Sequence, residues 1–250
     1  MLLIKNCPVC DAADFSPFLT CKDHTVSKEN FQIVSCNSCG FKFTNPIPTP
    51  QDLGRYYKSE DYISHSNTKK GIVSRLYHLV RNYTLKQKEQ ILLKHVSRGT
   101  LLDYGCGTGM FLQACKKSGW NVRGIEPDAG ARTIAESLGV SVYSDLSQLP
   151  QGSNERFDAI SLWHVLEHVV DLKGTLAFFK SRLSSAGVLV IAVPNYRSFD
   201  ASHYGANWAA YDVPRHLYHF DLESVTQLMD RSGFKLVETL PMKFDSFYVS

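Results

Sequence analysis

The chain has 250 residues and a mass of 28.1 kDa, which suffices for one large domain or for a catalytic domain with a smaller module. Its composition, 44% hydrophobic, 20% charged and 12% aromatic, excludes a disordered or fibrous protein, and a net charge of +3 is too small to indicate nucleic acid as the partner. The longest apolar run, Val188 to Val193, has six residues, whereas a membrane-spanning helix needs about 20. We therefore expect a cytoplasmic protein without a membrane span.

Four of the seven cysteines form two pairs with identical Cys-x-x-Cys spacing. Such a pair lets two thiolates reach one ion at ~2.3 Å, and two pairs complete the tetrahedron of a closed structural zinc site. Gly40 follows the second pair and favours its turn, because glycine adopts positive φ freely. Cys21 and His24 lie between the pairs and remain alternative ligands. The predicted zinc ligands are Cys7, Cys10, Cys36 and Cys39.

The segment after the cysteine pairs separates them from the rest of the chain. Three prolines between Asn45 and Pro50 predict an extended connector, and apolar spacing from Ile72 to Val96 predicts a long amphipathic helix. Between Arg55 and Arg98, ten Lys or Arg and three Asp or Glu give a local charge of +7, which suits a solvated helix face or a site for a phosphate-bearing acceptor. The expected domains are a zinc-binding module at 1–45, a connector with the helix at 46–98, and a catalytic domain at 99–250.

From Thr100 onward, short apolar strands alternate with helices. This alternation predicts an α/β fold with a doubly wound, mostly parallel, Rossmann-like sheet, preceded by a small zinc-ribbon-like module. Strands are expected at Leu101–Tyr104, Val122–Glu126, Ser141–Ser144, Asp158–Trp163, Val188–Val193 and Lys235–Leu240, and 244–250 is the candidate for a closing seventh strand. Helices are expected at Met110–Ser118, Ala129–Leu138, Leu172–Leu183 and Leu222–Arg231.

The first of these strands runs into a loop with the spacing Gly-x-Gly-x-Gly, from Gly105 to Gly109, and a helix follows. An open α/β sheet binds its cofactor at this place, because glycines let the backbone approach the ligand and the helix N-terminus favours an anionic group. Met110 stands where a nicotinamide-binding fingerprint has Gly or Ala. Glu126, at the end of the next strand, is an acidic side chain that can accept hydrogen bonds from ribose hydroxyls.

These segments, together with Phe157 to Ile160 and Val165 to Val169, resemble the class I S-adenosylmethionine-dependent methyltransferases over about Thr100 to Leu240. The resemblance implies that the glycine loop lies against the methionine part of S-adenosylmethionine and that Glu126 holds the ribose. It also implies that Asp145 reaches the adenine amine, and that the residues after the fourth strand line the cofactor and face the acceptor. The cofactor-binding residues expected are Asp103, Gly105, Cys106, Gly107, Gly109, Glu126, Pro127, Asp145, Leu146 and Trp163.

The run from His164 to His168 reads His-x-x-Glu-His, the pattern of one class of zinc proteases. We reject a protease, because it needs both histidines and the glutamate on one helix, whereas here the pattern begins where a predicted strand ends. Some methyltransferases that act on phenolic hydroxyls carry a similar Glu-x-x-Glu-His run that holds a divalent ion. His164 replaces the first glutamate, a departure that counts against the same ion here.

Methyl transfer from a sulfonium is an in-line displacement, and a hydroxyl or carbon acceptor must also lose a proton. The segment from His203 to Phe220 follows the fifth strand, and eight of its eighteen residues are His, Tyr, Trp or Phe. We expect this segment, residues 203–220, to form a lid over the acceptor pocket. His216 is the candidate base, because an imidazole with a pKa near ~6.5 can take a proton at neutral pH.

The whole layout is similar to bacterial deoxysugar C-methyltransferases that act on nucleotide-linked sugars. That resemblance implies a catalytic Glu-His pair in the lid, where this chain has Arg215-His216, and a helping tyrosine in the connector, near Tyr62. Arginine replaces the glutamate, so carbon methylation does not carry over, and Arg215 could instead hold a phosphate or carboxylate of the acceptor. The predicted catalytic residues are His216, His164 and Tyr62.

The sequence thus favours a methyltransferase for a small or carrier-linked metabolite, such as a nucleotide-linked sugar. The first alternative is an RNA methyltransferase that grips phosphates with the zinc module and the basic helix. Two features disfavour it: no Asn-Pro-Pro-Tyr run follows the fourth strand, and the zinc module has no alternation of aromatic and basic residues. The second alternative is a non-catalytic cofactor-binding or zinc adaptor protein, which the complete glycine loop and the His-rich lid disfavour.

Overall fold

The computed structural model describes residues 1–57, 72–150 and 155–242. The chain forms two compact units, and segments from both ends of the chain build the first one. The domain boundaries expected at 1–45, 46–98 and 99–250 stay a prediction. The first unit comprises Met1–Asn67, Glu167–Leu176 and Val193–Ser250, and the second comprises Thr68–Leu166 and Ala177–Ala192.

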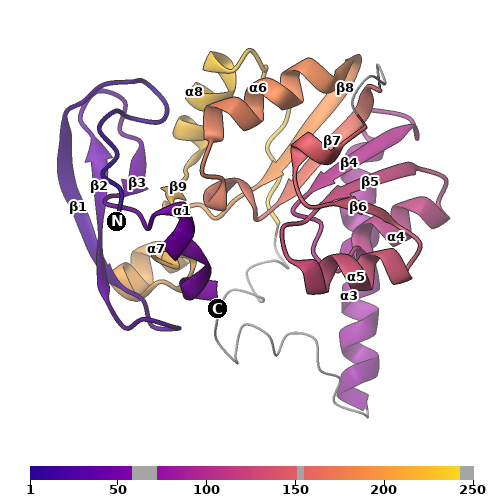
Figure 1. Ribbon diagram of the computed structural model, residues 1–250, viewed down its shortest axis with the longest axis horizontal. Helices are drawn as coiled ribbons and strands as arrows, with labels where there is room; N and C mark the ends of the chain where they lie inside the picture. The colour runs from indigo at the N-terminus through magenta and orange to yellow at the C-terminus, as the bar shows by residue number, and fades with distance from the viewer. Residues whose placement is uncertain (58–71, 151–154, 243–250) are drawn as a thin grey trace. The chain divides into compact units, whose positions relative to one another are not determined.

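An antiparallel sheet of four strands organises the first unit, in the order β1-β2-β3-β9. The strands are β1 (Phe15–Lys22), β2 (Asn30–Cys36), β3 (Lys42–Thr44) and β9 (Tyr218–His219). Figure 1 shows β1 to β3 side by side as indigo arrows. Because β9 belongs to the lid and pairs Tyr218 with Phe43, the lid and the cysteine-bearing module share one sheet.

Side chains from the sheet and the lid form the core of the first unit. Its buried members are Cys21, Phe31, Ile33, Tyr56, Tyr211 and Val213. Short helices connect these parts: α1 (Pro50–Leu53), η1 (Gly54–Tyr57), η4 (Leu166–His168), α7 (Phe199–Tyr204), η5 (Gly205–Asn207) and η6 (Ala209–Tyr211). Asp221 caps the N-terminus of helix α8 (Leu222–Arg231), where the side chains of Asp221 and Ser224 each accept a hydrogen bond from the other's backbone amide in a capping box.

A parallel sheet of five strands forms the second unit, in the order β6-β5-β4-β7-β8. It confirms the predicted doubly wound fold and the first five predicted strands, although β8 starts five residues before the predicted Val188. The strands are β4 (Thr100–Tyr104), β5 (Asn121–Ile125), β6 (Ser141–Tyr143), β7 (Phe157–Trp163) and β8 (Leu183–Ala192). The helices are α3 (Ile72–Leu93), α4 (Met110–Lys117) and α5 (Ala129–Ser137), and the 3-10 turn η3 (Leu146–Gln148) follows β6.

Helix α6 (Leu172–Arg182) precedes β8, as the sequence predicted. Within the ranges that the structure describes, no helix is both long and apolar enough to cross a membrane.

The sixth strand predicted at 235–240 is wrong. These residues follow α8 as irregular chain, and most of them are exposed, including Val237 at 76%. A strand needs a neighbouring strand to complete its hydrogen bonds, and among the described residues β8 pairs with β7 alone. The apolar residues at 235–240 alone were therefore insufficient to predict a strand. The candidate closing strand at 244–250 lies outside the described residues.

Candidate functional site

The two cysteine pairs adopt the same turn. The amide of Asp11 donates to the carbonyl of Cys7 at 3.0 Å, and the amide of Gly40 donates to the carbonyl of Cys36 at 2.8 Å. Both turn residues lie in the left-handed region, with φ of +65° at Asp11 and +74° at Gly40. The sequence indicated this geometry for Gly40, while Asp11 achieves it as one of the few residue types that tolerate positive φ. The matching turns aim four thiols at one point.

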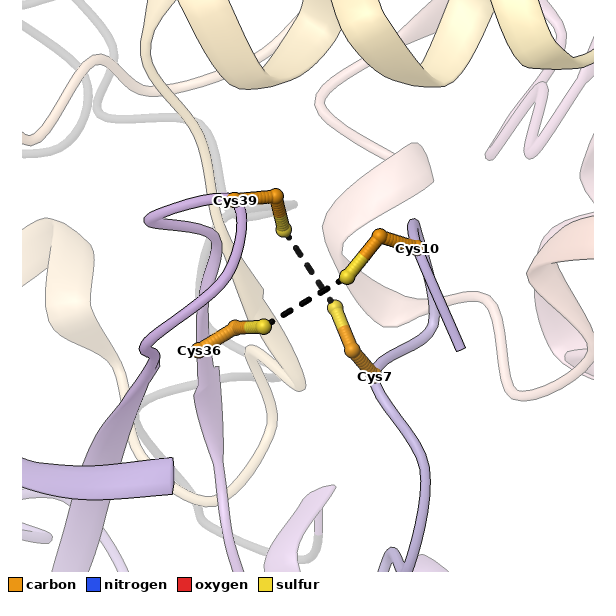
Figure 2. A group of neighbouring side chains, drawn as sticks. All are labelled: Cys7, Cys10, Cys36 and Cys39. Carbon is orange, nitrogen blue, oxygen red and sulfur yellow. Dashed lines mark hydrogen bonds between the residues drawn. The ribbon is translucent and has the colours of Figure 1, made fainter. Parts of the chain in front are cut away.

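Figure 2 shows the four sulfurs pointing toward one another, with Cys7 opposite Cys39 and Cys10 opposite Cys36. The Sγ–Sγ distances are 3.6 Å and 3.5 Å, close to the ~3.8 Å that four 2.3 Å zinc–sulfur bonds give in a tetrahedron. Burial raises the pKa of Cys39 to about 11, and it raises that of Cys7 as well. A divalent cation would supply the positive charge that buried thiolates need. The residues present therefore fit zinc, and Cys21 is buried elsewhere, in the core of this unit.

The glycine loop in the second unit is built for close approach of a ligand. Gly105, Gly107 and Gly109 all have positive φ, between +53° and +76°. A Cβ on Gly105 would meet Val165 at 2.4 Å, and one on Gly109 would meet Ala135 at 2.6 Å, so both glycines are required by packing. A Cβ on Gly107 would meet nothing within 4 Å. Open space at Gly107 is what a cofactor lying against the loop requires.

Glu126 holds the loop in shape. Its Oε2 accepts a hydrogen bond from the amide of Gly107 at 2.8 Å, and its Oε1 accepts one from the amide of Asp128 at 2.9 Å. The side chain is half-buried at the end of β5. A carboxylate fixed by two amides presents its remaining lone pairs in a defined direction, which suits bonds from the two hydroxyls of a ribose. The predicted residues Cys106 and Pro127 flank these contacts, Cys106 buried and Pro127 exposed.

Asp103 lies one residue before the end of β4, and Trp163 ends the neighbouring strand β7. Asp103 is buried and accepts a hydrogen bond from the Ser161 hydroxyl at 2.6 Å, and burial raises its pKa to about 7 despite that bond and the charge of Lys88. The Trp163 indole packs edge-on against Phe111, with Lys88 Nζ 4.7 Å from its ring centroid. Its buried Nε1–H has no hydrogen-bond partner among the residues described. A buried donor of this kind fits a bound polar ligand.

Asp145 and His164 lie just beyond β6 and β7. Asp145 is exposed and caps the turn η3, because its Oδ1 accepts from the amide of Ser147 at 2.9 Å; Leu146 follows it, half-buried. His164 has a φ of +58°, which is strained for a residue with a Cβ, and its amide donates to the carbonyl of Ala192 at 2.9 Å. Strain at the carboxyl end of a central strand is typical of functional positions in such sheets.

Arg215 is not aimed at an acceptor. Its side chain is 2% exposed and donates from Nε to the Asp212 carboxylate at 2.9 and 3.0 Å. Its Nη1 donates to the carbonyl of Tyr56 at 2.9 Å, and its Nη2 donates to Asp23 Oδ1 at 3.1 Å. Burial disfavours the charge, but the two carboxylates outweigh it and raise the pKa of Arg215. The guanidinium thus ties the lid to the β1–β2 loop and to η1.

His216, the predicted base, lies in a group of three side chains that we call the lid cluster: Glu167, His168 and His216. One potential ligand atom of each lies within 4.8 Å of the others. Glu167 is fully buried, His216 is 7% exposed and His168 is half-buried. The two imidazole rings are 4.5 Å apart and nearly perpendicular. The backbone holds the cluster together, since the amide of Leu217 donates to the carbonyl of Glu167 at 2.8 Å.

Backbone carbonyls fix the tautomer of both imidazoles. Nδ1 of His216 lies 2.8 Å from the carbonyl of Ala210, and Nδ1 of His168 lies 3.0 Å from that of Arg215. A carbonyl oxygen only accepts, so each Nδ1 carries a proton, and Nε2 of His216 lies 3.9 Å from Asp212 Oδ2. The Tyr57 hydroxyl lies 3.1 Å from the same Nδ1 of His168.

Sequence reasoning missed three members of this region: Tyr57, Glu167 and His168. The His-x-x-Glu-His pattern contains Glu167 and His168 and is the signal that points to them, although by itself it indicates no contact with the lid. The structure instead joins its last two residues to the lid histidine. Tyr62, predicted to help at the site, lies outside the described residues.

With the geometry established, comparison with known proteins shows the family. Residues 77–239, well over half of the chain, match the model of a methyltransferase domain. A ubiquinone biosynthesis O-methyltransferase of Rhodopseudomonas palustris is 27% identical over 149 residues, which cover 55% of this chain and 59% of that protein. The protein of the same name from a Bradyrhizobium species is 30% identical over 122 residues, which cover 46% and 48%. The chain thus spans about half of the length of the curated relatives that it matches.

Solved structures show the same fold. A methyltransferase from Archaeoglobus fulgidus is 24% identical with a TM-score of 0.52, and the match covers 63% of this chain and 71% of that one. Magnesium protoporphyrin IX methyltransferase from Synechocystis, solved with bound S-adenosylhomocysteine, is 14% identical with a TM-score of 0.54, covering 73% and 88%. The chain belongs to the methyltransferase domain family.

Proposed function

We propose that the protein methylates a small or carrier-linked metabolite, such as a nucleotide-linked sugar, with His216 as the general base. The observation that carries this proposal is the fixed tautomer of His216, whose Nδ1 lies 2.8 Å from the carbonyl of Ala210. The ring is nearly buried, and with the Nδ1 proton held by that carbonyl, Nε2 is the nitrogen of a neutral His216 that can accept a proton from an acceptor. The relatives that match this chain are named for the methylation of a small molecule, which supports the acceptor class.

We propose that residues of the second unit bind S-adenosylmethionine. When bound, this cofactor supplies an electrophilic methyl group, and the electron pair of the broken carbon–sulfur bond stays on sulfur. Gly107 lets the backbone approach the ligand, Glu126 accepts hydrogen bonds from the ribose, and the buried indole N–H of Trp163 donates to it. The remaining proposed contacts are Asp103, Gly105, Cys106, Gly109, Pro127, Asp145 and Leu146.

The proposed acceptor chemistry needs a proton to leave as the new bond to the methyl forms. His216 takes that proton on Nε2, and the carbonyl of Ala210 then stabilises the positive imidazolium through the Nδ1–H that it already holds. We propose that His164 and Tyr62 also contact the acceptor. Since Arg215 is occupied by two carboxylates and a carbonyl, the phosphate or carboxylate of an acceptor must be held by other groups.

We propose that zinc in the four-cysteine site is structural. Four protein ligands leave no position for water or substrate, and the site anchors the sheet that the lid strand β9 joins. Its role is therefore to stabilise the unit that carries His216.

The test is transfer of labelled methyl from S-adenosylmethionine into small and carrier-linked fractions of the producing cell, with and without nuclease. We expect nuclease-resistant label, and the variant His216→Gln should lower kcat by about 10²- to 10⁴-fold while binding the cofactor normally. The control is His203→Gln, because His203 is an exposed lid histidine outside the cluster. Nuclease-sensitive label would replace the proposal with an RNA acceptor, and normal turnover in His216→Gln would exclude His216 as the base.

A further inference from the structure

We infer that Thr44 is a positioning residue, which holds the lid backbone in place for the base that the proposed function assigns to His216. Thr44 is the last residue of β3 and is fully buried. Its hydroxyl donates to the carbonyl of His216 at 2.9 Å, and its amide donates to the carbonyl of Leu217, also at 2.9 Å. One residue of the cysteine-bearing module therefore holds two successive carbonyls of the lid, including that of the proposed base.

His219, a third lid residue, orients the Thr44 hydroxyl. Nε2 of His219 lies 3.1 Å from Thr44 Oγ1. A carbonyl oxygen only accepts, so the single hydroxyl proton points to His216, and the hydroxyl oxygen accepts from an Nε2–H of His219. Burial and Lys42 lower the pKa of His219 to about 3, so its ring is neutral at neutral pH and carries one proton, on Nε2. The hydrogen bonds thus run in one direction from His219 through Thr44 to His216, and each bond polarises the next.

Two further hydrogen bonds fix His216 from within the lid. Its amide donates to the carbonyl of Asp212 at 3.0 Å, and its Nδ1 donates to the carbonyl of Ala210 at 2.8 Å. These bonds move with the lid, because all three residues belong to it. The bonds from Thr44 instead tie the lid to β3, and they extend the pairing of β3 with β9 as far as the residue that carries the imidazole. Thr44 therefore fixes the proposed base relative to the sheet.

The hydroxyl of Thr44 acts on position and not on proton transfer. Without it, the carbonyl of His216 and the Nε2–H of His219 would both lose this partner while buried, so the lid would shift toward other partners. A displacement of about 1 Å at a reacting group can lower a rate about 100-fold, because the base, the acceptor and the methyl group must meet in one geometry. Loss of the hydroxyl should therefore slow methyl transfer and leave cofactor binding unchanged.

Thr44→Val tests the inference, because valine has nearly the shape of threonine but no hydroxyl. We expect it to lower the single-turnover rate of methyl transfer into the small-metabolite fraction by about 10- to 100-fold, with an unchanged Kd for S-adenosylmethionine in calorimetry. Thr44→Ser keeps the hydroxyl and should have a rate within about threefold of the wild type. The matched control is Thr20→Val, since Thr20 lies on β1 of the same sheet and its exposed hydroxyl donates to Gln32. Should Thr44→Val fail to fold, Thr44→Ala removes the same hydroxyl without placing a methyl group against the two polar atoms.

Two further measurements separate positioning from a general loss of structure. In a His216→Gln background, Thr44→Val should change the rate by less than about twofold, because a residue that acts through His216 has nothing left to position. Hydrogen exchange of the lid amides, measured by mass spectrometry, is independent of activity. It should be at least about tenfold faster in Thr44→Val than in the wild type or in Thr20→Val.

The outcomes separate this inference from the proposed function. Faster exchange, together with a rate that falls only when His216 is present and recovers in Thr44→Ser, supports the positioning role. Unchanged exchange in Thr44→Val, or an equal loss of rate with and without His216, would overturn it. Normal turnover by His216→Gln alone would contradict the proposed base, whereas the exchange measurement would still decide whether Thr44 holds the lid.

Discussion

Replacing Arg215 with alanine tests whether this residue holds the lid or the acceptor. The variant removes the guanidinium from Asp23, whose side chain is 0% exposed, and from Asp212 and the Tyr56 carbonyl. Removing one partner of a buried ion pair costs about 3–5 kcal/mol, because the other charge stays buried. Asp23 keeps hydrogen bonds from the amides of Thr25 and Ser27, so we expect the lower end, about 3 kcal/mol.

The assay is urea unfolding followed by tryptophan fluorescence, which gives the free energy of unfolding from the midpoint and slope. The control is Lys173→Ala, because Lys173 and Asp11 form an ion pair with side chains 51% and 68% exposed, and such pairs contribute less than about 1 kcal/mol. Arg215→Lys should fall between wild type and Arg215→Ala, since an ammonium cannot reach all three acceptors. A loss below about 1 kcal/mol in Arg215→Ala, combined with a raised KM for the acceptor, would refute the structural role.

Three further predictions address the acid sensitivity, the cofactor loop and the zinc. Burial and Lys42 lower the pKa of His219 to about 3, so the native state takes up fewer protons than the unfolded state, and the free energy of unfolding should fall as the pH drops from about 6.5 toward 3. In His219→Gln, the decrease in this free energy between pH 6.5 and 4.5 should be smaller than in the wild type by about 2–3 kcal/mol. An equal decrease in both proteins, measured by urea unfolding, would contradict this prediction. Gly107→Ala should weaken S-adenosylmethionine binding, measured by calorimetry, by at least about tenfold. The left-handed φ at position 107 should lower the free energy of unfolding by only about 1–2 kcal/mol, because an added Cβ meets no neighbouring atom. Equal binding by wild type and variant would mean that the cofactor lies elsewhere. The Cys39→Ser variant should contain no zinc in metal analysis and should have a lower Tm than the wild type, because binding of the ion stabilises the folded state. The Cys21→Ala variant should retain its zinc. The reverse result would make Cys21 a ligand.

Local sequence patterns predicted the parts of the site that local structure builds. Glycine spacing between Gly105 and Gly109 identified the loop because each positive φ restricts the residue type. The Cys-x-x-Cys spacing identified the metal-binding turns because both thiols of a pair must reach one ion. The acidic end of β5 was equally predictable, since strand and loop are adjacent in the sequence. The five strands of the parallel sheet follow from alternating apolar runs.

Contacts between distant segments could not be read from the sequence. The turn that carries Glu167 and the lid that carries His216 are separated by a helix and a strand, and no local pattern shows that they meet. Arg215 is a similar case: arginine in a lid suggested an acceptor contact, whereas its buried carboxylate partner Asp23 lies near the other end of the chain. Pairing of β9 with β3, and the missing strand at 235–240, also depend on which neighbouring strand is present.

The most direct measurement is a single-turnover methyl-transfer assay with labelled S-adenosylmethionine, fractions of small and carrier-linked metabolites, and the wild-type, His216→Gln and His203→Gln proteins side by side. We predict nuclease-resistant label in the wild type and in His203→Gln, and a rate lower by about 10²- to 10⁴-fold in His216→Gln with cofactor binding intact. Label confined to nuclease-sensitive polymer, or equal rates in all three proteins, would contradict a metabolite methyltransferase that uses His216 as its base.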